Sequence, residues 1–206
     1  DPMAHAAEPP FTHDRTPRIG VLLTNLGTPD AATPSAVRRY LAQFLTDPRV
    51  IEIPAWAWKP ILYGVILFVR PTQSAKKYAA IWTDQGSPLM VHSQQQALLV
   101  RGYLGERGID ADVVLAMRYG EPSIFAVLRT LAERRVERIL VLPMYPQYSA
   151  TTTASALDAV FAVLARTRNV PEVRWIKHFH DDAGYIGALR QSVLQHWSRH
   201  GRAQDR

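Results

Sequence analysis

The sequence predicts an α/β fold, in which a doubly wound parallel sheet carries helices on both faces. Short and almost entirely apolar runs recur along the 206 residues, as is typical of strands buried on both faces. Segments with apolar residues at helical spacing separate these runs. Strands that alternate with helices in this way form parallel sheets with right-handed crossovers.

The first strand and the first helix have the clearest signals. Residues 19–26 form a continuous apolar run, which turn residues then end. Thr33 provides an N-cap, and Pro34 suits the first position of the helix that follows. We expect this helix to end before Pro48, and a short extended piece to follow over 50–53.

Residues 54–71 are apolar on nearly all sides and contain three prolines. One interpretation is a buried helical hairpin. The other is an exposed hydrophobic lip that lies beside a pocket or touches a membrane. The residues themselves favour neither interpretation.

The rest of the chain alternates between helices and strands. The expected helices cover 76–81, 93–107, 121–131, 157–164 and 185–197. The expected strands cover 112–117, 138–142 and 171–176. The helix at 121–131 is expected to begin at Glu121-Pro122.

Composition excludes several classes of site. The chain has no cysteine, so it forms no disulfide within itself and holds no cysteine-ligated cluster. The net charge is +6, but the arginines are spread over many segments, and we therefore expect no nucleic-acid partner. No apolar run reaches the roughly 18 residues of a membrane-spanning helix. The lack of cysteine fits a cytoplasmic location, which we expect. Residues 1–16 look like a disordered tail, with Asp1-Pro2 as a cloning remnant.

Three turns at the ends of expected strands point to a ligand site. They are 25–29, 118–120 and 144–155, and the carboxyl ends of parallel strands meet at one edge. The third turn carries two tyrosines and a row of hydroxyls, which suits a large flat organic ligand better than a phosphate. No glycine-rich phosphate-binding motif occurs. Arg118 could pair with a ligand carboxylate or, as the simpler alternative, with Glu121.

A histidine pair raises the question of a metal site. His178 and His180 are followed by Asp181 and Asp182, and such a set could ligate a divalent ion from a loop. The spacing is short and nonspecific, so we favour a structural or surface role and predict no metal ligand. No G-x-S-x-G nucleophile motif occurs either.

Four segments together resemble the ferrochelatase family, whose members insert ferrous iron into a porphyrin. They are I-G-V-L-L-T-N-L-G-T-P-D at 19–30, K-K-Y-A-A-I-W-T-D-Q-G-S-P-L at 76–89, M-R-Y-G-E-P at 117–122 and L-P-M-Y-P-Q-Y-S-A-T-T-T-A-S at 142–155. The resemblance implies two similar Rossmann-like (chelatase-like) lobes with the porphyrin between them. It implies a first lobe over 17–176, with the lip at 54–71, and the start of a truncated second lobe over 177–206.

The resemblance also implies which residues contact the porphyrin. The positions that match the family's contacts are Leu26, Arg70, Tyr78, Ser87, Arg118 and Tyr119. It implies ferrous iron and protoporphyrin IX as substrates, haem as product and no tightly bound cofactor. It favours the exposed lip. Together with the basic charge of the chain, the apolar face of this lip could dock the protein on the anionic inner face of a membrane.

One departure from the family pattern limits the expected activity. The family's histidine motif, S-F-H-G or H-S-L-P, is absent, and none of the seven histidines matches it. We therefore expect no catalytic and no metal-binding residue in this chain, which would be the first half to two thirds of the enzyme and inactive alone. The alternatives are a non-catalytic porphyrin-binding module and another tetrapyrrole metal chelatase.

Overall fold

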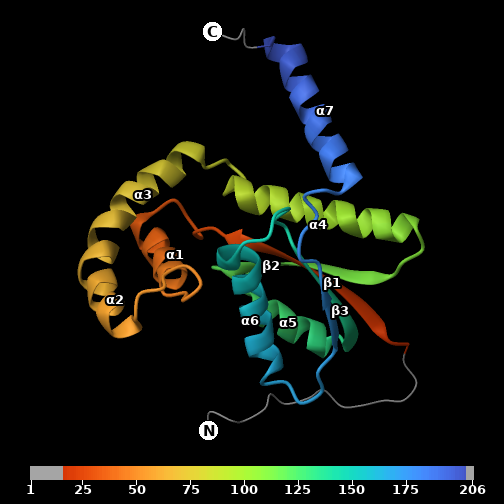
Figure 1. Cartoon of the computed structure of the whole chain (residues 1–206), viewed down its shortest axis with the longest axis horizontal. Helices are drawn as coiled ribbons and strands as arrows, with labels where there is room; N and C mark the ends of the chain where they lie inside the picture. Colours follow the sequence, from red (N-terminus) through yellow and green to blue (C-terminus); the bar gives the residue numbers. More distant parts are fainter. Residues whose placement is uncertain (1–15, 203–206) are drawn as a thin grey trace.

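A computed structural model describes residues 16–202 and contains a four-stranded parallel sheet between two layers of helices (Figure 1). The sheet has the order β2-β1-β3-β4, and all three strand pairs are parallel. The strands are β1 (Arg18–Gly27), β2 (Ala111–Tyr119), β3 (Val136–Pro143) and β4 (Glu172–Trp175). The predicted α/β fold class is therefore confirmed. The predicted disordered tail lies outside the described residues, apart from Thr16.

The helices cover both faces and one end of this sheet, except α7, which has no buried residue and extends away from it (Figure 1). They are α1 (Pro34–Leu45), α2 (Ala55–Ile61), α3 (Leu67–Ile81), α4 (Pro88–Glu106), α5 (Ile124–Glu133), α6 (Ser155–Leu164) and α7 (Ala183–His200). Two π-helical turns, η1 (Leu62–Ile66) and η2 (Ala150–Ala154), join α2 to α3 and precede α6. In Figure 1, α4 covers one face, α5 and α6 cover the other, and α1 to α3 gather at the carboxyl ends of the strands.

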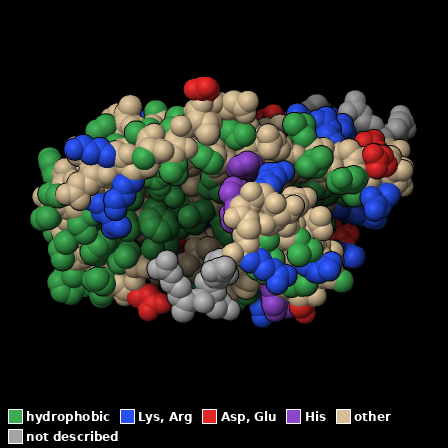
Figure 2. All heavy atoms as spheres, turned by 90° about the horizontal axis from the view of Figure 1, so that it is seen from above, with side chains coloured by type: hydrophobic (Ala, Val, Ile, Leu, Met, Phe, Trp, Pro, Cys, Tyr) green, Lys and Arg blue, Asp and Glu red, His purple; other side chains and the backbone are tan. Residues whose placement is uncertain are grey.

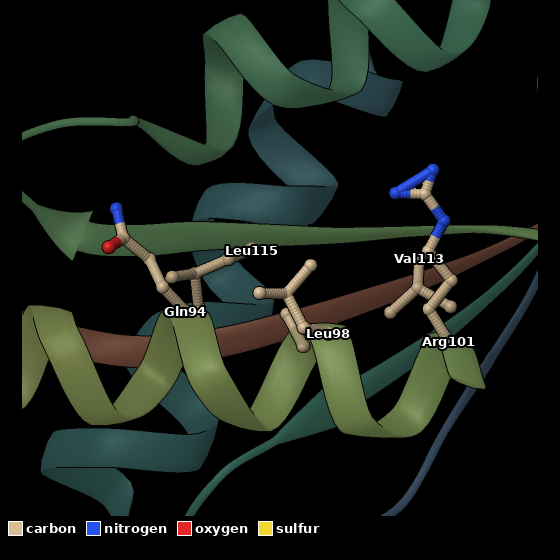
Figure 3. Close-up of a pocket in the computed structure, with 6 residues that line it drawn as sticks. Gln94, Leu98, Arg101, Val113 and Leu115 are labelled. Carbon is tan, nitrogen blue, oxygen red and sulfur yellow. The ribbon is translucent and has the colours of Figure 1, made fainter. Parts of the chain in front are cut away.

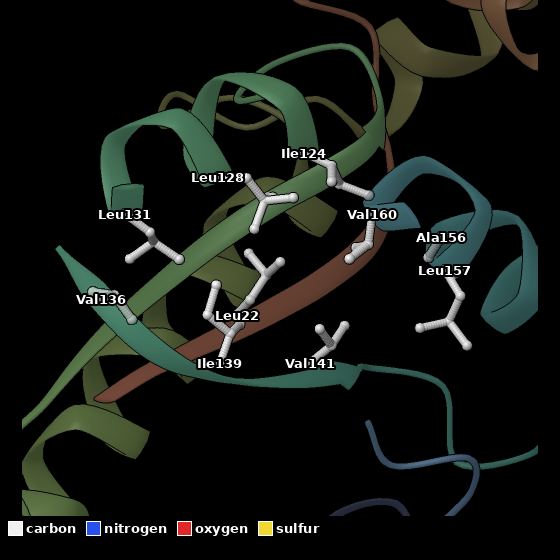
Figure 4. Close-up of a cluster of buried hydrophobic side chains, with 11 residues drawn as sticks. Leu22, Ile124, Leu128, Leu131, Val136, Ile139, Val141, Ala156, Leu157 and Val160 are labelled. Atoms are coloured by element: carbon white, nitrogen blue, oxygen red, sulfur yellow. The ribbon is translucent and has the colours of Figure 1, made fainter. Parts of the chain in front are cut away.

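The main hydrophobic core lies between the sheet and the layer of α5 and α6. Figure 4 shows side chains from both helices directed toward Leu22 of β1 and Val141 of β3, and both strand residues are fully buried. A second cluster lies at the carboxyl ends of the strands, where α1, η1 and α3 pack around Tyr119. This second cluster fixes the surroundings of the predicted ligand site.

The N-cap of α1 is confirmed, whereas the starts of two helices and the structure of residues 50–81 differ clearly from the sequence prediction. The Thr33 hydroxyl accepts a hydrogen bond from the Ala36 N–H. The helix expected at 121–131 begins at Ile124, because the Ser123 side chain caps it by accepting from the Ala126 N–H. The helix expected at 93–107 begins five residues earlier, at Pro88.

The third difference concerns residues 50–81. The extended piece predicted over 50–53 is wrong, because the Val50 and Ile51 N–H groups both donate to the Asp47 carbonyl and form a turn. The helix predicted over 76–81 is the end of a 15-residue helix, α3, which continues through Pro71. Leu67, Pro71 and Ala75 recur at four-residue spacing and are all buried, so tertiary packing overrides the helix-breaking preference of proline.

Candidate ligand site at the carboxyl edge of the sheet

The order of the strands places a topological switch point between β1 and β3. From β1 the chain crosses to β2 on one side, while β3 pairs with β1 on the other. In open α/β sheets, ligands bind at the carboxyl ends of the strands at such a point. The turns after β1, β2 and β3 all lie at this edge, as the sequence predicts.

Gly27 brings the turns after β1 and β2 into direct contact. It pairs with Tyr119, has a φ of +111°, and a Cβ added to it would lie 1.8 Å from the Tyr119 carbonyl oxygen. Only glycine has both the missing side chain and the freedom to adopt this φ. The close approach of the two strand ends therefore depends on this residue.

A buried polar network stands behind these turns, and Asp47 is its centre. One carboxylate oxygen of Asp47, Oδ2, accepts from Arg118 Nη2 at 2.6 Å and from the Tyr119 hydroxyl at 2.8 Å. The Ser155 hydroxyl donates to the same oxygen. The other carboxylate oxygen, Oδ1, accepts from the Arg49 N–H at 2.7 Å. Asp47 is 5% exposed, so its charge is balanced inside the protein rather than by water.

Three elements supply the members of this network. Asp47 lies just after α1, Arg118 and Tyr119 end β2, and Ser155 begins α6. The hydroxyl-rich turn delivers Ser155, because the Ser149 side chain accepts from the Thr151 N–H and starts the π-helical turn η2. Arg118 then donates through Nε to the Ser155 hydroxyl and carbonyl, at 2.7 and 2.9 Å.

The network holds Asp47 ionised and Tyr119 neutral. Burial alone would raise the pKa of Asp47, but the hydrogen bonds from Ser155, the Arg49 N–H and Tyr119, together with the charge of Arg118, lower it overall. Burial raises the pKa of Tyr119 to about 12, against an opposing effect of the Ser155 hydrogen bond. Burial also raises the pKa values of Tyr40 and Tyr145. The interior behind the turns therefore contains neutral hydroxyls and one internally balanced ion pair.

Several buried hydroxyls at this edge have no hydrogen-bond partner among the described residues. They belong to Thr24 at the end of β1, Thr28 in the following turn, Tyr145 after β3 and Thr153 in η2. An unpaired buried hydroxyl is costly in a folded protein. A buried water could satisfy such groups.

The structure brings four of the six predicted site residues together. Leu26 and Tyr78 pack against the cluster that contains Tyr119. Arg118 lies over the Tyr119 ring, with its guanidinium carbon 4.7 Å from the ring centroid. Tyr119 itself is 1% exposed, so its ring is part of the protein interior.

The other two predicted residues lie apart from this group. Arg70 is on the exposed side of α3, and Ser87 is buried at the N-cap position of α4, where its side chain makes no capping hydrogen bond. No hydrogen bond, ion pair or ring contact within residues 16–202 joins either one to the other four.

Arg118 has a partner that the sequence did not suggest. The alternative partner, Glu121, is wrong, because its carboxylate accepts from the Ser123 N–H instead. Asp47 takes that place from 71 residues away, and Ser155 lies 37 residues away on the other side. Both were missed, because Asp47-Pro48 looks like an ordinary helix end and no local pattern connects it with β2.

The segment from α2 to α3 exposes a hydrophobic surface beside this edge. Trp56 is 81% exposed and Phe68 is 64% exposed, whereas Leu62 and Leu67 point inward and are buried. Figure 2 shows hydrophobic side chains gathered where Figure 1 places α1 to α3, with a hollow beside them. The segment is therefore not a buried hairpin. We call residues 54–71 the lip.

Two pockets are lined by residues other than the six predicted ones. One lies between α4 and β2, where Leu98 faces Val113 and Leu115 on the face of β2 that α4 covers (Figure 3). The other lies between the end of α1 and α2 and is lined in part by Leu45 and Trp58. None of the six residues lines either pocket.

Comparisons with known proteins identify the relatives of this chain. A family model described as Ferrochelatase matches residues 18–206. The ferrochelatase of Janthinobacterium sp. (strain Marseille) is 60% identical over 200 residues, which cover 97% of this chain and 54% of the relative. That of Methylibium petroleiphilum is 57% identical over 202 residues, covering 98% and 56%. That of Chromobacterium violaceum is 56% identical over 203 residues, also covering 98% and 56%. The chain spans about half the length of these relatives.

Proposed function

The chain belongs to the ferrochelatase family, and we propose that it supplies the porphyrin-holding walls of an enzyme that inserts ferrous iron into protoporphyrin IX to form haem. One observation carries this proposal. The carboxyl edge at the switch point offers half-buried Leu26, Tyr78 and Tyr145 and exposed Tyr148 beside a hydrophobic hollow. Such a surface suits a flat apolar macrocycle better than a phosphate or a charged metabolite.

The six predicted residues divide into two roles in this proposal. Leu26 and Tyr78 are half-buried beside the strand ends and can pack on the macrocycle. Arg70 is exposed and can form a charge-assisted pair with a propionate. Arg118 and Tyr119 hold Asp47 and Ser155 and so shape the floor of the site from behind. We propose that Ser87, where α4 begins, borders the same site.

Metal insertion also requires a base, which we do not assign to this chain. Two pyrrole protons must leave as the ion enters, so a group that accepts protons must lie near the ring centre. The tyrosines of the edge are poor candidates, because burial keeps them protonated. We therefore propose that the 206-residue chain binds porphyrin but does not turn it over, with iron and porphyrin as substrates and no tightly bound cofactor.

Two parallel measurements test this proposal. Protoporphyrin IX is titrated into the purified chain by fluorescence, and ferrous-iron insertion is assayed with the chain and with the full-length product of its gene. Binding by both proteins, with turnover by the full-length protein alone, is the expected result. Turnover by the 206-residue chain would contradict the proposal that this chain lacks the base. Failure of both proteins to bind porphyrin would contradict the proposed site.

We further propose that the protein lies in the cytoplasm and that the lip docks on the anionic inner face of the cell membrane. Within residues 16–202, no helix is both long and apolar enough to cross a bilayer. Exposed Trp56 and Phe68, with the basic Lys59 and Arg70 nearby, suit a surface contact instead.

Vesicle cosedimentation tests the lip. The double variant Trp56→Ser/Phe68→Ser should lose binding to anionic vesicles. Leu98→Ser/Leu99→Ser is the matched control, because these side chains are 64% and 57% exposed on α4, away from the lip. Equal loss in both variants, or no binding by the unmodified protein, would contradict membrane docking.

A further inference from the structure

The loop after β4 brings three side chains that can ligate a metal close together. The ligand atoms of His178, His180 and Asp181 all lie within 4.8 Å of one another, and all three residues are exposed. The centroids of the two imidazole rings are 4.9 Å apart. It is the only group of three such side chains within residues 16–202. The proposed porphyrin site uses none of them.

The residue between the two histidines holds this loop in place. Phe179 is half-buried, and its ring packs edge-on against Tyr185 with 5.6 Å between centroids. Its N–H donates to the Pro146 carbonyl at 2.9 Å, and its own carbonyl accepts from the Asp182 N–H. Because Phe179 is fixed on one side, the imidazoles before and after it are left at the surface together.

The two aspartates of this loop have different surroundings. Asp182 caps α7, since its Oδ1 accepts from the Tyr185 N–H at 3.0 Å. Asp181 makes no hydrogen bond or ion pair with another described residue, and its carboxylate is the one that lies with the two imidazoles. The helix cap therefore leaves one carboxylate available to a cation.

We propose that His178, His180 and Asp181 bind one divalent first-row transition-metal ion. Two imidazoles and one carboxylate form a ligand set that suits ferrous iron, cobalt or zinc and leaves positions open to water. Two ligand atoms about 2.1 Å from one ion lie at most about 4.2 Å apart. The exposure of the three side chains permits them to rotate inward to such distances, while the backbone stays where Phe179 holds it.

The site lies beside the proposed porphyrin edge but does not depend on porphyrin binding. The Phe179–Pro146 hydrogen bond joins the loop to the turn after β3, and Lys177 lies over the Tyr148 ring of that turn at 5.1 Å. An ion held here is bound at the protein surface. Three protein ligands would leave coordination positions for water on such an ion.

A cobalt titration tests this site without porphyrin and without activity. Metal-free protein is titrated with Co²⁺, and the visible absorption of the bound ion is followed. We expect one ion per chain, and a dissociation constant at least about 100-fold higher for His178→Gln/His180→Gln, because loss of even a supporting partner costs about 10–100-fold. Asp181→Asn should weaken binding less than the double variant.

The second histidine pair provides the matched control. His196 and His200 stack on α7 with 4.5 Å between centroids, and no carboxylate within the described residues joins them. His196→Gln/His200→Gln removes the same number of imidazoles and should leave the affinity within about 3-fold, since the proposed ligands are intact. Unchanged binding in the loop variant, or loss of binding in the α7 variant, would overturn the proposal.

Discussion

Arg118 and Arg70 are both predicted to meet a ligand carboxylate, yet they lie in opposite surroundings. Arg118 is paired with buried Asp47 at 2.6 Å, and its side chain is 23% exposed. Arg70 lies on the outer side of α3, and it has no ion pair or hydrogen bond with another described residue. The charge of Arg118 therefore stabilises the fold, whereas the charge of Arg70 is available to pair with a ligand.

The two sides of the proposed site are built according to this difference. On the sheet side, Asp47 takes three donors on one oxygen, so the ion pair is complete before any ligand arrives. On the α3 side, Arg70 and the lip are exposed and Tyr78 is half-buried, so a ligand can still cover their surface. We therefore expect substitutions on the sheet side to change stability, and those on the α3 side to change binding.

The largest expected effect follows from removal of Asp47. Asp47→Ala leaves Arg118, Tyr119 and Ser155 facing a site without an acceptor, and the free energy of unfolding should fall by about 3 kcal/mol. Urea unfolding measures the change. Asp158→Ala is the control, because it breaks an ion pair with Arg49 in which both side chains are over 40% exposed, and the loss there should be much smaller. Equal losses would contradict the buried network.

The contribution of Asp47 should also depend on pH. Its pKa is lowered in the folded protein, so its stabilising effect is complete above the ordinary aspartate value of about 4. The effect is lost as the pH falls through the lowered value, because the unfolded chain then binds the proton more readily. The stability difference between wild type and Asp47→Asn should be constant from about pH 5 to 7 and shrink below about pH 4. A stability difference that grows as the pH falls would contradict the lowered pKa of Asp47.

A smaller effect is expected for Tyr119→Phe. The variant keeps the ring packed against Phe44, at 5.2 Å between centroids, but removes one donor to Asp47. The free energy of unfolding should fall by about 1.5 kcal/mol, as for a hydrogen bond to a charged group. Tyr103→Phe, on the exposed side of α4, is the control and should unfold as wild type does. If the free energy of unfolding falls by no more than in the control, the Tyr119 hydroxyl contributes nothing to stability.

The smallest effect on stability is expected for Arg70→Ala. An exposed side chain without a partner can be removed with a change within about 0.5 kcal/mol. Urea unfolding of this variant beside Arg118→Ala would sharpen the comparison between the two arginines. A loss at Arg70 as large as that at Arg118 would show that the two sides do not differ as described.

The sequence predicted what depends on local pattern and missed what depends on distant contacts. The strand at 19–26 and the cap at Thr33 follow from apolar runs and turn residues, and both are confirmed. The extended piece at 50–53 failed because the Asp47 carbonyl turns the chain there. The helix through Pro71 was missed, because it depends on the burial of Leu67, Pro71 and Ala75 against the rest of the protein, whereas a proline in the sequence usually ends a helix.

The candidate site shows the same limit. Leu26, Tyr78 and Tyr119 were predicted as neighbours through the family resemblance, and the structure packs them into one cluster. Whether an arginine is free or paired depends on a carboxylate 71 residues away, which no single-sequence pattern connects with it. The contacts of Leu26, Tyr78 and Tyr119 with a porphyrin remain a prediction.

The most direct test is a fluorescence titration of protoporphyrin IX and of its dimethyl ester into wild type and Arg70→Ala. The ester lacks the propionate charges that Arg70 is proposed to bind. Arg70→Ala should weaken binding of the free acid by about 10-fold, as expected for one charge-assisted contact, and should leave binding of the ester unchanged. Equal affinity of the variant and wild type for the free acid would contradict the proposal that the open arginine on α3 recognises the ligand.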